Sequence, residues 1–478
     1  AWADMYSYCN SVIEPWDGPA ALAMADGRWV CGGLDRNGLR PMRYVVTGDG
    51  LLIAGSEAGM VPVDESTIRE KGALGPGQMI AVDMVEGKLF HDVEMKDKLA
   101  AAQPYGEWVG KIVDLNALLK DVPETQTYTG SDLRKRQIAA GFTVEELEQV
   151  LAPMAEDGKE MVASMGDDTP PAVLSSVYRP LSHYFRQNFS QVTNPPIDSL
   201  REGRVMSLKT RFGNLRNVLD ETNAQSEILV LESPFVATAE FEVMVDRFGD
   251  QVAFIDCSFP VSQGLDDLRL GLERIRAEAE DAVRSGAGQL VLTDEHQGPD
   301  KVGMPMILAT SAVHSWLTRK GLRTFCSINV RSAECIDPHY FAVLIGCGAT
   351  TVNAYLAQDS IADRIARGLL EGSLTDAMRR YRDAIDAGLL KIMSKMGISV
   401  ISSYRGGLNF EAVGLSRAMV AEYFPGMQSR ISGIGLTGVE QKLEEVHRRG
   451  WLGGADVLPI GGFYKARRSG EKHAWEAQ

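Results

Sequence analysis

The first 90 residues alternate short apolar runs with turn-forming pairs, a pattern that predicts antiparallel strands. The runs are Ala21–Met24, Trp29–Gly32, Tyr44–Val46, Leu51–Ala54 and Met79–Val82. Asp-Gly, Asn-Gly and Glu-Gly pairs separate them, and such pairs favour hairpin turns because glycine readily adopts a positive φ. A meander of this kind needs a second layer over its apolar face, and no obvious layer precedes it. We therefore expect part of an antiparallel β sandwich.

The pattern becomes helical over residues 96–165, where Thr143-Val144-Glu145-Glu146 has the form of a capping box. This stretch is expected to be a helical connector between domains. It contains no repeat or low-complexity tract, so a flexible linker is not indicated.

The segment from Ser164 to Leu208 holds more conformationally fixed residues than any other part of the chain. Asp167-Asp168-Thr169 offers a helix N-cap, and Pro170-Pro171 would occupy the first helical positions, where a missing N–H costs nothing. The predicted helix ends at Asn194-Pro195-Pro196, because a residue before proline is pushed out of the α region. It would carry these apolar and aromatic side chains at helical spacing: Val173, Leu174, Val177, Leu181, Tyr184, Phe185 and Phe189.

From Glu227 onward, β-rich runs alternate with helical segments, which predicts a parallel sheet with helical crossovers. The predicted strands are Ile228–Leu231, Val252–Ile255, Gln289–Thr293, Thr324–Val330 and Ala349–Val352. The predicted helices are Asp266–Ser285, Pro305–Lys320, His339–Ile345 and Ser373–Leu390, followed by a helical or mixed tail. The spacing suits an open sheet and a (β/α) barrel equally well.

Composition and charge narrow the class of protein. At 478 residues the chain is too long for one core, and about three domains are expected. A formal charge of −15 argues against a nucleic-acid or anionic-membrane partner. No apolar run approaches the roughly 20 residues of a membrane span, so a cytoplasmic protein is expected. Six scattered cysteines form no Cys-x-x-Cys pair and are expected to be reduced and mostly buried.

Several long motifs occur in a specific order. Trp16–Ala21, Gly33–Pro41 and Ser56-Glu57 resemble the second half of the glutaminase domain of glutamate synthase, a class II amidotransferase family. Gln103-Pro104-Tyr105 resembles that family's central domain. So do Met165–Pro170, Phe189–Asp198 and Lys395–Ser399.

The resemblance implies a segment of the glutamate synthase large subunit and an α/β fold. A partial antiparallel amidotransferase sandwich would occupy residues 1–90. Residues 91–225 would form the helical connector and the start of the central domain. Residues 226–450 would form a central α/β domain resembling an incomplete (β/α) barrel, and residues 451–478 would lead to a flavin domain.

The family turns glutamine and 2-oxoglutarate into two glutamates, with FMN, an iron–sulfur cluster and electrons from NADPH or ferredoxin. Its nucleophile is a cysteine at residue one, whereas this sequence has Ala1, and Cys9 is expected to pack in the sandwich. The resemblance therefore implies no catalytic, cofactor-binding or metal-binding residue on this chain. The implied partners are the remainder of the large subunit and a reductase subunit.

The site residues that the resemblance favours lie in the Asp167–Pro171 loop. The family must carry ammonia between two active sites through a shielded path. Thr169 is small and able to hydrogen-bond a passing ammonia molecule, with Asp168 beside it and Leu174 as an apolar neighbour. A plain helix cap is an equally good interpretation of this loop, and the two roles are compatible.

Two other motifs suggest chemistry more weakly. Asp294-Glu295-His296 follows a predicted strand and could form the site of an autonomous small-molecule enzyme, although consecutive residues cannot all face one metal ion. Gly433-Ile434-Gly435-Leu436-Thr437-Gly438 spells a dinucleotide motif, but Ser429–Ser432 is not a convincing strand before it. We expect this run simply to begin a helix. A docking module for a reductase subunit is the third alternative.

Overall fold

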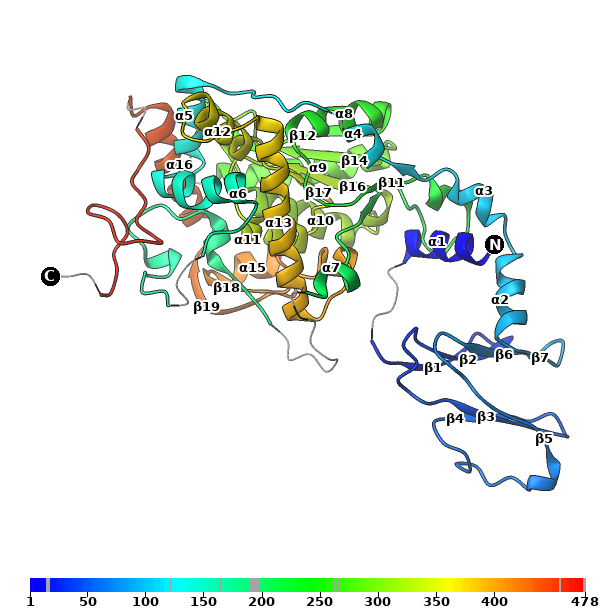
Figure 1. Ribbon diagram of the computed structural model, residues 1–478. Helices are drawn as coiled ribbons and strands as arrows, with labels where there is room; N and C mark the ends of the chain where they lie inside the picture. The colour runs from blue at the N-terminus through cyan, green and yellow to red at the C-terminus, as the bar shows by residue number, and fades with distance from the viewer. Residues whose placement is uncertain are drawn as a thin grey trace. The chain divides into compact units, whose positions relative to one another are not determined.

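The computed structural model describes residues 1–13, 18–120, 122–162, 166–189, 198, 200–261, 264, 266–454 and 457–475. The chain divides into two compact units, an N-terminal unit that ends at Ile112 and a C-terminal unit that begins at Val113. Both are mixed α/β in content, with antiparallel sheets in each and a parallel sheet in the second (Figure 1). No helix among the described residues is apolar and long enough to span a membrane.

The N-terminal unit contains two antiparallel sheets, with strand orders β1-β2-β6-β7 and β4-β3-β5. Their strands are β1 (Ala21–Ala25), β2 (Trp29–Leu34), β3 (Arg43–Thr47), β4 (Leu52–Gly55), β5 (Ile68–Ala73), β6 (Met79–Asp83) and β7 (Lys88–Phe90). All five strands predicted from the apolar runs are present. The turn glycines Gly27, Gly50 and Gly87 have positive φ, as the turn pairs require.

Three helices accompany these sheets: α1 (Trp2–Val12), α2 (Asp92–Ala100) and α3 (Tyr105–Val109). The sequence analysis did not anticipate α1. Tyr8 lies 5.4 Å from Tyr105 and 5.1 Å from Trp108 between ring centroids, so α1 is held by aromatic packing on α3. The expectation that Cys9 packs in a sandwich is wrong, because Cys9 is exposed on this helix.

The C-terminal unit is built on a four-stranded parallel sheet of order β12-β14-β16-β17. Its strands are β12 (Val252–Asp256), β14 (Gln289–Thr293), β16 (Ser327–Arg331) and β17 (Thr351–Asn353). Side chains alternate across β14: Leu290 and Leu292 belong to one hydrophobic cluster and Val291 to another. A strand that is covered on both faces has a continuous run of apolar residues in its sequence. The positions of these strands could therefore be predicted from the sequence.

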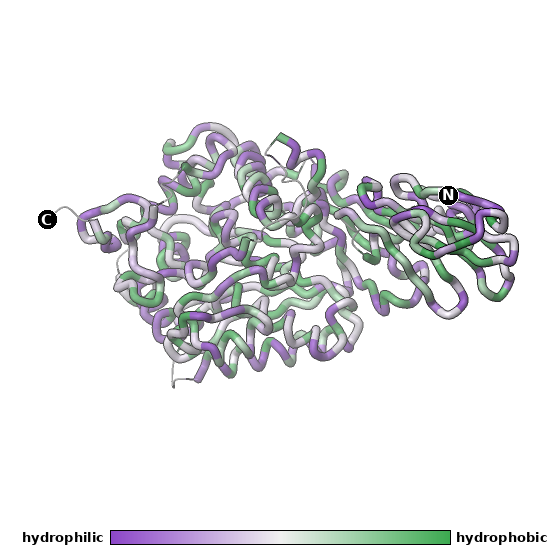
Figure 2. The backbone as a smooth tube through the Cα atoms, turned by 90° about the horizontal axis from the view of Figure 1, so that it is seen from below, coloured by the Kyte–Doolittle hydropathy of each residue, from purple (hydrophilic) through white to green (hydrophobic). Residues whose placement is uncertain are grey.

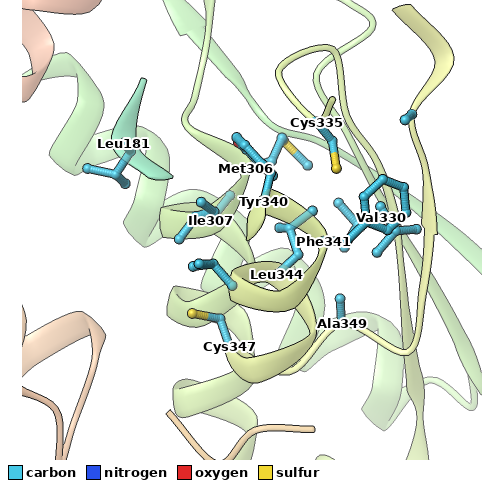
Figure 3. Packing of buried hydrophobic residues seen from close by; sticks show 14 of the residues in the cluster. Leu181, Met306, Ile307, Val330, Cys335, Tyr340, Phe341, Leu344, Cys347 and Ala349 are labelled. Carbon is cyan, nitrogen blue, oxygen red and sulfur yellow. The ribbon is translucent and has the colours of Figure 1, made fainter. Parts of the chain in front are cut away.

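Helices cover this sheet and enclose the core. They include α8 (Thr238–Phe248), α9 (Asp267–Arg284), α10 (Met306–Arg319), α11 (Pro338–Gly346), α12 (Tyr355–Ala366) and α13 (Leu374–Met396). Buried residues of α9 recur every three or four positions, at Leu268, Leu272, Ile275, Ala279 and Val283. Figure 2 shows hydrophobic and hydrophilic stretches alternating along the chain. Figure 3 shows side chains of α10 packing against those of α11 in the core.

Smaller elements complete the fold. The short helices are α4 (Asn116–Leu119), α5 (Gly130–Ala139), α6 (Ala152–Asp157), α7 (Glu202–Val205), α14 (Ile401–Tyr404) and α15 (Arg417–Tyr423). The remaining strands are β8 (Val113–Asp114), β9 (Phe185–Gln187), β10 (Thr210–Phe212), β11 (Leu229–Leu231), β13 (Ser258–Pro260), β15 (Lys301–Gly303), β18 (Phe410–Leu415) and β19 (Gln428–Ile434). Helix α16 (Leu436–Trp451) is the last element described. The predicted strand at Ile228–Leu231 exists, but it pairs with β8 and β10.

The long helix predicted after Pro170-Pro171 is wrong. The segment forms two 3₁₀ turns, Ala172–Leu174 and Leu181–Tyr184, and then strand β9, which pairs antiparallel with β18. Pro180 explains the break, because proline removes a helical hydrogen bond and pushes Arg179 toward extended backbone. Leu174 is 73% exposed rather than buried. The predicted stop at Asn194-Pro195-Pro196 lies outside the described residues.

The glycine-rich run at 433–438 begins within strand β19, whereas the sequence predicted no strand there. β19 pairs in parallel with β18, and α16 begins directly after Gly435, its N-cap residue. A Cβ on Gly433 would lie 2.0 Å from the backbone oxygen of Gly414. Gly433 therefore permits the close approach of two strand backbones, and the prediction that the run begins a helix is confirmed.

We predict that Gly433→Ala lowers the free energy of unfolding by about 1–3 kcal/mol, because the new methyl group overlaps backbone that has no room to move. Gly435→Ala, two residues further along the chain, is the matched control: its Cβ would meet Ser416 Oγ at an ordinary 3.5 Å. Urea denaturation of both variants measures the difference. Equal stability of the two would contradict this role of Gly433.

Candidate functional site

Polar residues gather where the strands of the parallel sheet end. Asp294 and Glu295 follow β14, Glu334 lies three residues beyond β16, and Tyr355 begins α12 after β17. The carboxyl edge of a parallel sheet is where open α/β proteins bind ligands. This edge is therefore the candidate functional site of the C-terminal unit.

Asp294 is buried at this edge and fully engaged by its neighbours. Its two carboxyl oxygens accept the Ala333 N–H at 3.1 and 2.9 Å, and Oδ1 also accepts the Tyr355 hydroxyl at 3.0 Å. Burial raises the pKa of Asp294 to about 8. The carboxyl group thus joins the ends of three successive elements of the sheet.

Glu334 forms a second buried acid close to the first. Its Oε2 accepts the Tyr340 hydroxyl at 2.5 Å and the Met306 N–H at 3.3 Å. Burial raises the pKa of Glu334 to about 7. Two small cavities share this residue in their walls, one of about 40 Å³ and one of about 10 Å³ that Asp294 also lines.

The three side chains of the Asp294-Glu295-His296 motif diverge. Asp294 is buried, Glu295 is half-buried and His296 is exposed. Glu295 Oε1 accepts from Arg331 at 2.9 Å and from the Tyr128 hydroxyl at 3.1 Å. Among the described residues no group of three or more potential ligands could hold a metal ion. The geometry therefore favours a structural polar cluster over the small-molecule site that the motif suggested.

The larger cavity is walled on one side by the C-terminal tail, residues 457–475, which contains no helix or strand. Arg179 lines it, with its guanidinium 3.5 Å above the Phe463 ring and its Nε 3.5 Å from Glu471. Glu471 is 1% exposed and also accepts the Ser175 hydroxyl at 2.6 Å. A buried ion pair stacked on an aromatic ring holds the tail against the 175–179 segment.

A second carboxylate, Glu145, fixes the same tail at another point. It accepts the backbone N–H groups of Phe463, Tyr464 and Lys465, at 2.6, 3.1 and 3.0 Å. Thr143 caps the neighbouring helix start, since its N–H donates to Glu146 at 2.9 Å and its hydroxyl oxygen accepts the Glu145 N–H at 3.1 Å. The helix start is thus encoded locally, whereas no local pattern marks the role of Glu145, because its partners lie more than 300 residues away.

Asp168, Thr169 and Leu174, the predicted ammonia-path residues, lie on one segment beside this tail. Asp168 binds the tail: Oδ1 lies 2.7 Å from His473 Nδ1, and its backbone oxygen accepts the Ala474 N–H at 3.0 Å. The hydrogen bond to His473 lowers the pKa of Asp168. Thr169 donates its N–H and hydroxyl to Asp167, so the loop is a turn rather than a helix cap.

Four of the six cysteines are buried: Cys257, Cys326, Cys335 and Cys347. Burial raises the pKa of each of these thiols. A buried thiol with a raised pKa is a poor nucleophile and a poor metal ligand. These residues act as small apolar side chains in the core, as the sequence analysis expected.

Comparisons with known proteins agree with this architecture. A family model for class II glutamine amidotransferases matches residues 1–108, and one for the glutamate synthase central domain matches residues 135–416, more than half of the chain. The chain thus joins an amidotransferase-type N-terminal unit to a central domain of glutamate synthase type. It belongs to the glutamate synthase family.

Curated relatives match almost the whole chain. It is 61% identical to the glutamate synthase [NADPH] large chain of Azospirillum brasilense over 99% of its length. It is 40% identical to ferredoxin-dependent glutamate synthase 2 of Synechocystis over 98% of its length. The chain spans 31% of the length of each relative.

The likeness to solved structures is distant. The flavin-binding domain of baker's yeast flavocytochrome b2 aligns with 58% of this chain and 91% of its own, at 12% identity and a TM-score of 0.31. That score is too low to carry an argument about fold or function.

We predict that Glu334→Gln becomes more stable relative to the unchanged protein as pH rises. Folding raises the pKa of this carboxyl group above its value in the unfolded chain, about 4.3. The protein therefore loses stability as pH rises from the unfolded-state pKa to the folded-state pKa. Glutamine keeps the acceptor for Tyr340 but does not titrate. The difference in unfolding free energy should grow by about 1 kcal/mol per pH unit between about pH 4.5 and 7.

Chemical denaturation at several pH values measures this difference. Glu148→Gln, at an exposed position of the same unit, is the control and should give a flat difference profile. If the difference in unfolding free energy for Glu334→Gln is also independent of pH, ionisation of Glu334 does not destabilise the protein.

Proposed function

We propose that this chain forms the scaffold of a glutamate synthase, joining the glutaminase part of the enzyme to its flavin part. The observation that supports this most strongly is the match to two family models in the order amidotransferase, then central domain. The reaction would be that of the family, in which glutamine and 2-oxoglutarate give two glutamates with electrons from NADPH, NADH or ferredoxin. The cytoplasm is the expected compartment.

The proposed division of the chain follows the sequence analysis. Residues 1–90 would be part of the amidotransferase sandwich, 91–225 the connector and 226–450 a central domain like an incomplete barrel. Residues 451–478 would lead toward the flavin domain. The partners would be the remainder of the large subunit and a reductase subunit.

The described residues offer no site of the right chemistry for the family's cofactors. An iron–sulfur cluster needs several convergent thiolates, but the described residues contain no metal-ligand group, and burial raises the pKa of the four buried thiols. A flavin phosphate would need free backbone at a glycine-rich loop. Gly433 instead faces the backbone of Gly414.

The second part of the proposal is that Asp168, Thr169 and Leu174 line the ammonia path. Asp168 bonds to the tail and Thr169 to Asp167, so the loop is held in one conformation, as the wall of a conduit requires. Leu174 presents an exposed apolar side chain on the same segment. An apolar wall would favour neutral ammonia over ammonium and would exclude water.

The purified 478-residue chain is predicted to be colourless and to release no ammonia from glutamine. Absorbance spectroscopy checks for the visible bands of flavin, and a glutaminase assay checks for hydrolysis. Stoichiometric flavin in the preparation would overturn the scaffold assignment and would favour an autonomous enzyme.

The conduit is tested in a full-length glutamate synthase that carries this segment. Leu174→Trp should obstruct the path, so that ammonia escaping to solution per glutamate formed rises by about twofold or more. Leu219→Trp is the control, because Leu219 is an exposed leucine elsewhere in the same unit. If ammonia release per glutamate stays low in both variants, Leu174 does not line the path. The scaffold role would be unaffected by that result.

A further inference from the structure

His473 on the C-terminal tail is held by two acceptors at once. Its Nδ1 lies 2.7 Å from Asp168 Oδ1, and its Nε2 lies 2.8 Å from the backbone oxygen of Gly462. A carbonyl and a carboxylate oxygen can only accept, so each ring nitrogen must donate. Neutral imidazole carries one N–H, and only the doubly protonated ring can make both bonds.

The carboxyl group of Asp168 also binds the backbone beyond His473. Its Oδ2 accepts the Trp475 N–H at 3.2 Å, and the Asp168 carbonyl accepts the Ala474 N–H at 3.0 Å. Three consecutive tail residues therefore depend on one aspartate. The His473 side chain is 10% exposed and that of Asp168 is 31% exposed, so the pair is partly shielded from solvent.

From this geometry we infer that Asp168, His473 and Gly462 form a proton-dependent latch that fixes the end of the tail to the 166–171 loop. The latch is closed when the imidazole is doubly protonated and Asp168 is ionised. When the ring loses one proton to solvent, a lone pair faces the oxygen of either Asp168 or Gly462, and one of the two bonds is lost. Residues 473–475 are then held less tightly against the loop.

The sign of the pH dependence follows from the two partners. The contribution of the imidazolium is present at low pH and is lost as pH rises through the imidazole titration. The contribution of Asp168, whose pKa is lowered, is lost only in acid, as its carboxylate becomes protonated. The latch is therefore closed in mildly acidic solution and opens toward alkaline pH.

Other charged groups near the ring come from both packed segments. On the loop side, Asp167 accepts from Thr169, and Arg179 lies 3.5 Å from Glu471. On the tail, Glu471 lies two residues before His473, and Arg467 packs beside Gly462. Of these groups, the imidazole of His473 is the one that lies between the Asp168 carboxylate and the Gly462 oxygen.

The tail carries its own internal control. Phe463, Tyr464 and Lys465 donate their N–H groups to Glu145, and these hydrogen bonds do not involve His473. The latch thus predicts that only the last part of the tail responds to pH. The inference does not depend on the ammonia path, although a latch on Asp168 would also position the proposed path residue Thr169.

Hydrogen exchange of the full chain tests the latch, after correction for the intrinsic pH dependence of amide exchange. Protection of the Ala474 and Trp475 amides should fall about tenfold or more as pH rises across the imidazole titration, the factor of one charge-assisted hydrogen bond. Protection of the Phe463–Lys465 amides should not change. Histidine-selective ¹⁵N spectra should show both ring nitrogens of His473 protonated in the closed state.

Two variants and a control complete the test. His473→Gln should leave the Ala474 and Trp475 amides weakly protected at every pH, and Asp168→Asn should abolish the pH dependence. His91→Gln, in the N-terminal unit, should behave as the unchanged protein. Protection that is independent of pH in the unchanged chain, or unaltered pH dependence in His473→Gln, would overturn the latch.

Discussion

Carboxylates that accept backbone N–H groups from distant segments hold the irregular parts of the C-terminal unit. Asp359, on α12, accepts the N–H groups of Thr127 and Tyr128 at 2.9 Å each. Glu145 and Asp168 do the same for the tail. A segment without a helix or strand cannot satisfy its own backbone, so it must find acceptors elsewhere or face water. These contacts decide where such segments lie.

The same carboxylates connect folding to protonation. Burial raises the pKa of Asp294 to about 8, of Glu334 to about 7 and of Asp359 to about 6. The pKa of Asp168, which is more exposed and hydrogen-bonded to His473, is lowered instead. The fold is therefore most stable when the buried acids at the sheet edge are neutral and when Asp168, in the latch, is charged. One kind of side chain serves as fixed structure in one place and as a pH-sensitive contact in another.

Side-chain hydrogen bonds and ion pairs hold the parts of the C-terminal unit together. The carboxyl edge of the parallel sheet is occupied by mutually bonded acids and tyrosines, with small cavities between them. The 166–175 segment and the tail lie against each other through Asp168 and Glu471.

The sequence by itself determined the elements whose signal is local. Strands such as Gln289–Thr293 and helices such as Asp267–Arg284 follow from apolar periodicity, and the ordered motifs identified the family. Only the tertiary structure decided the rest. The helix predicted after Pro171 became 3₁₀ turns and strand β9 because β18 offers backbone partners and Pro180 interrupts the helix. Glu145, Glu471 and His473 acquired their roles because folding brings together residues about 300 positions apart, and no local pattern records such a distance.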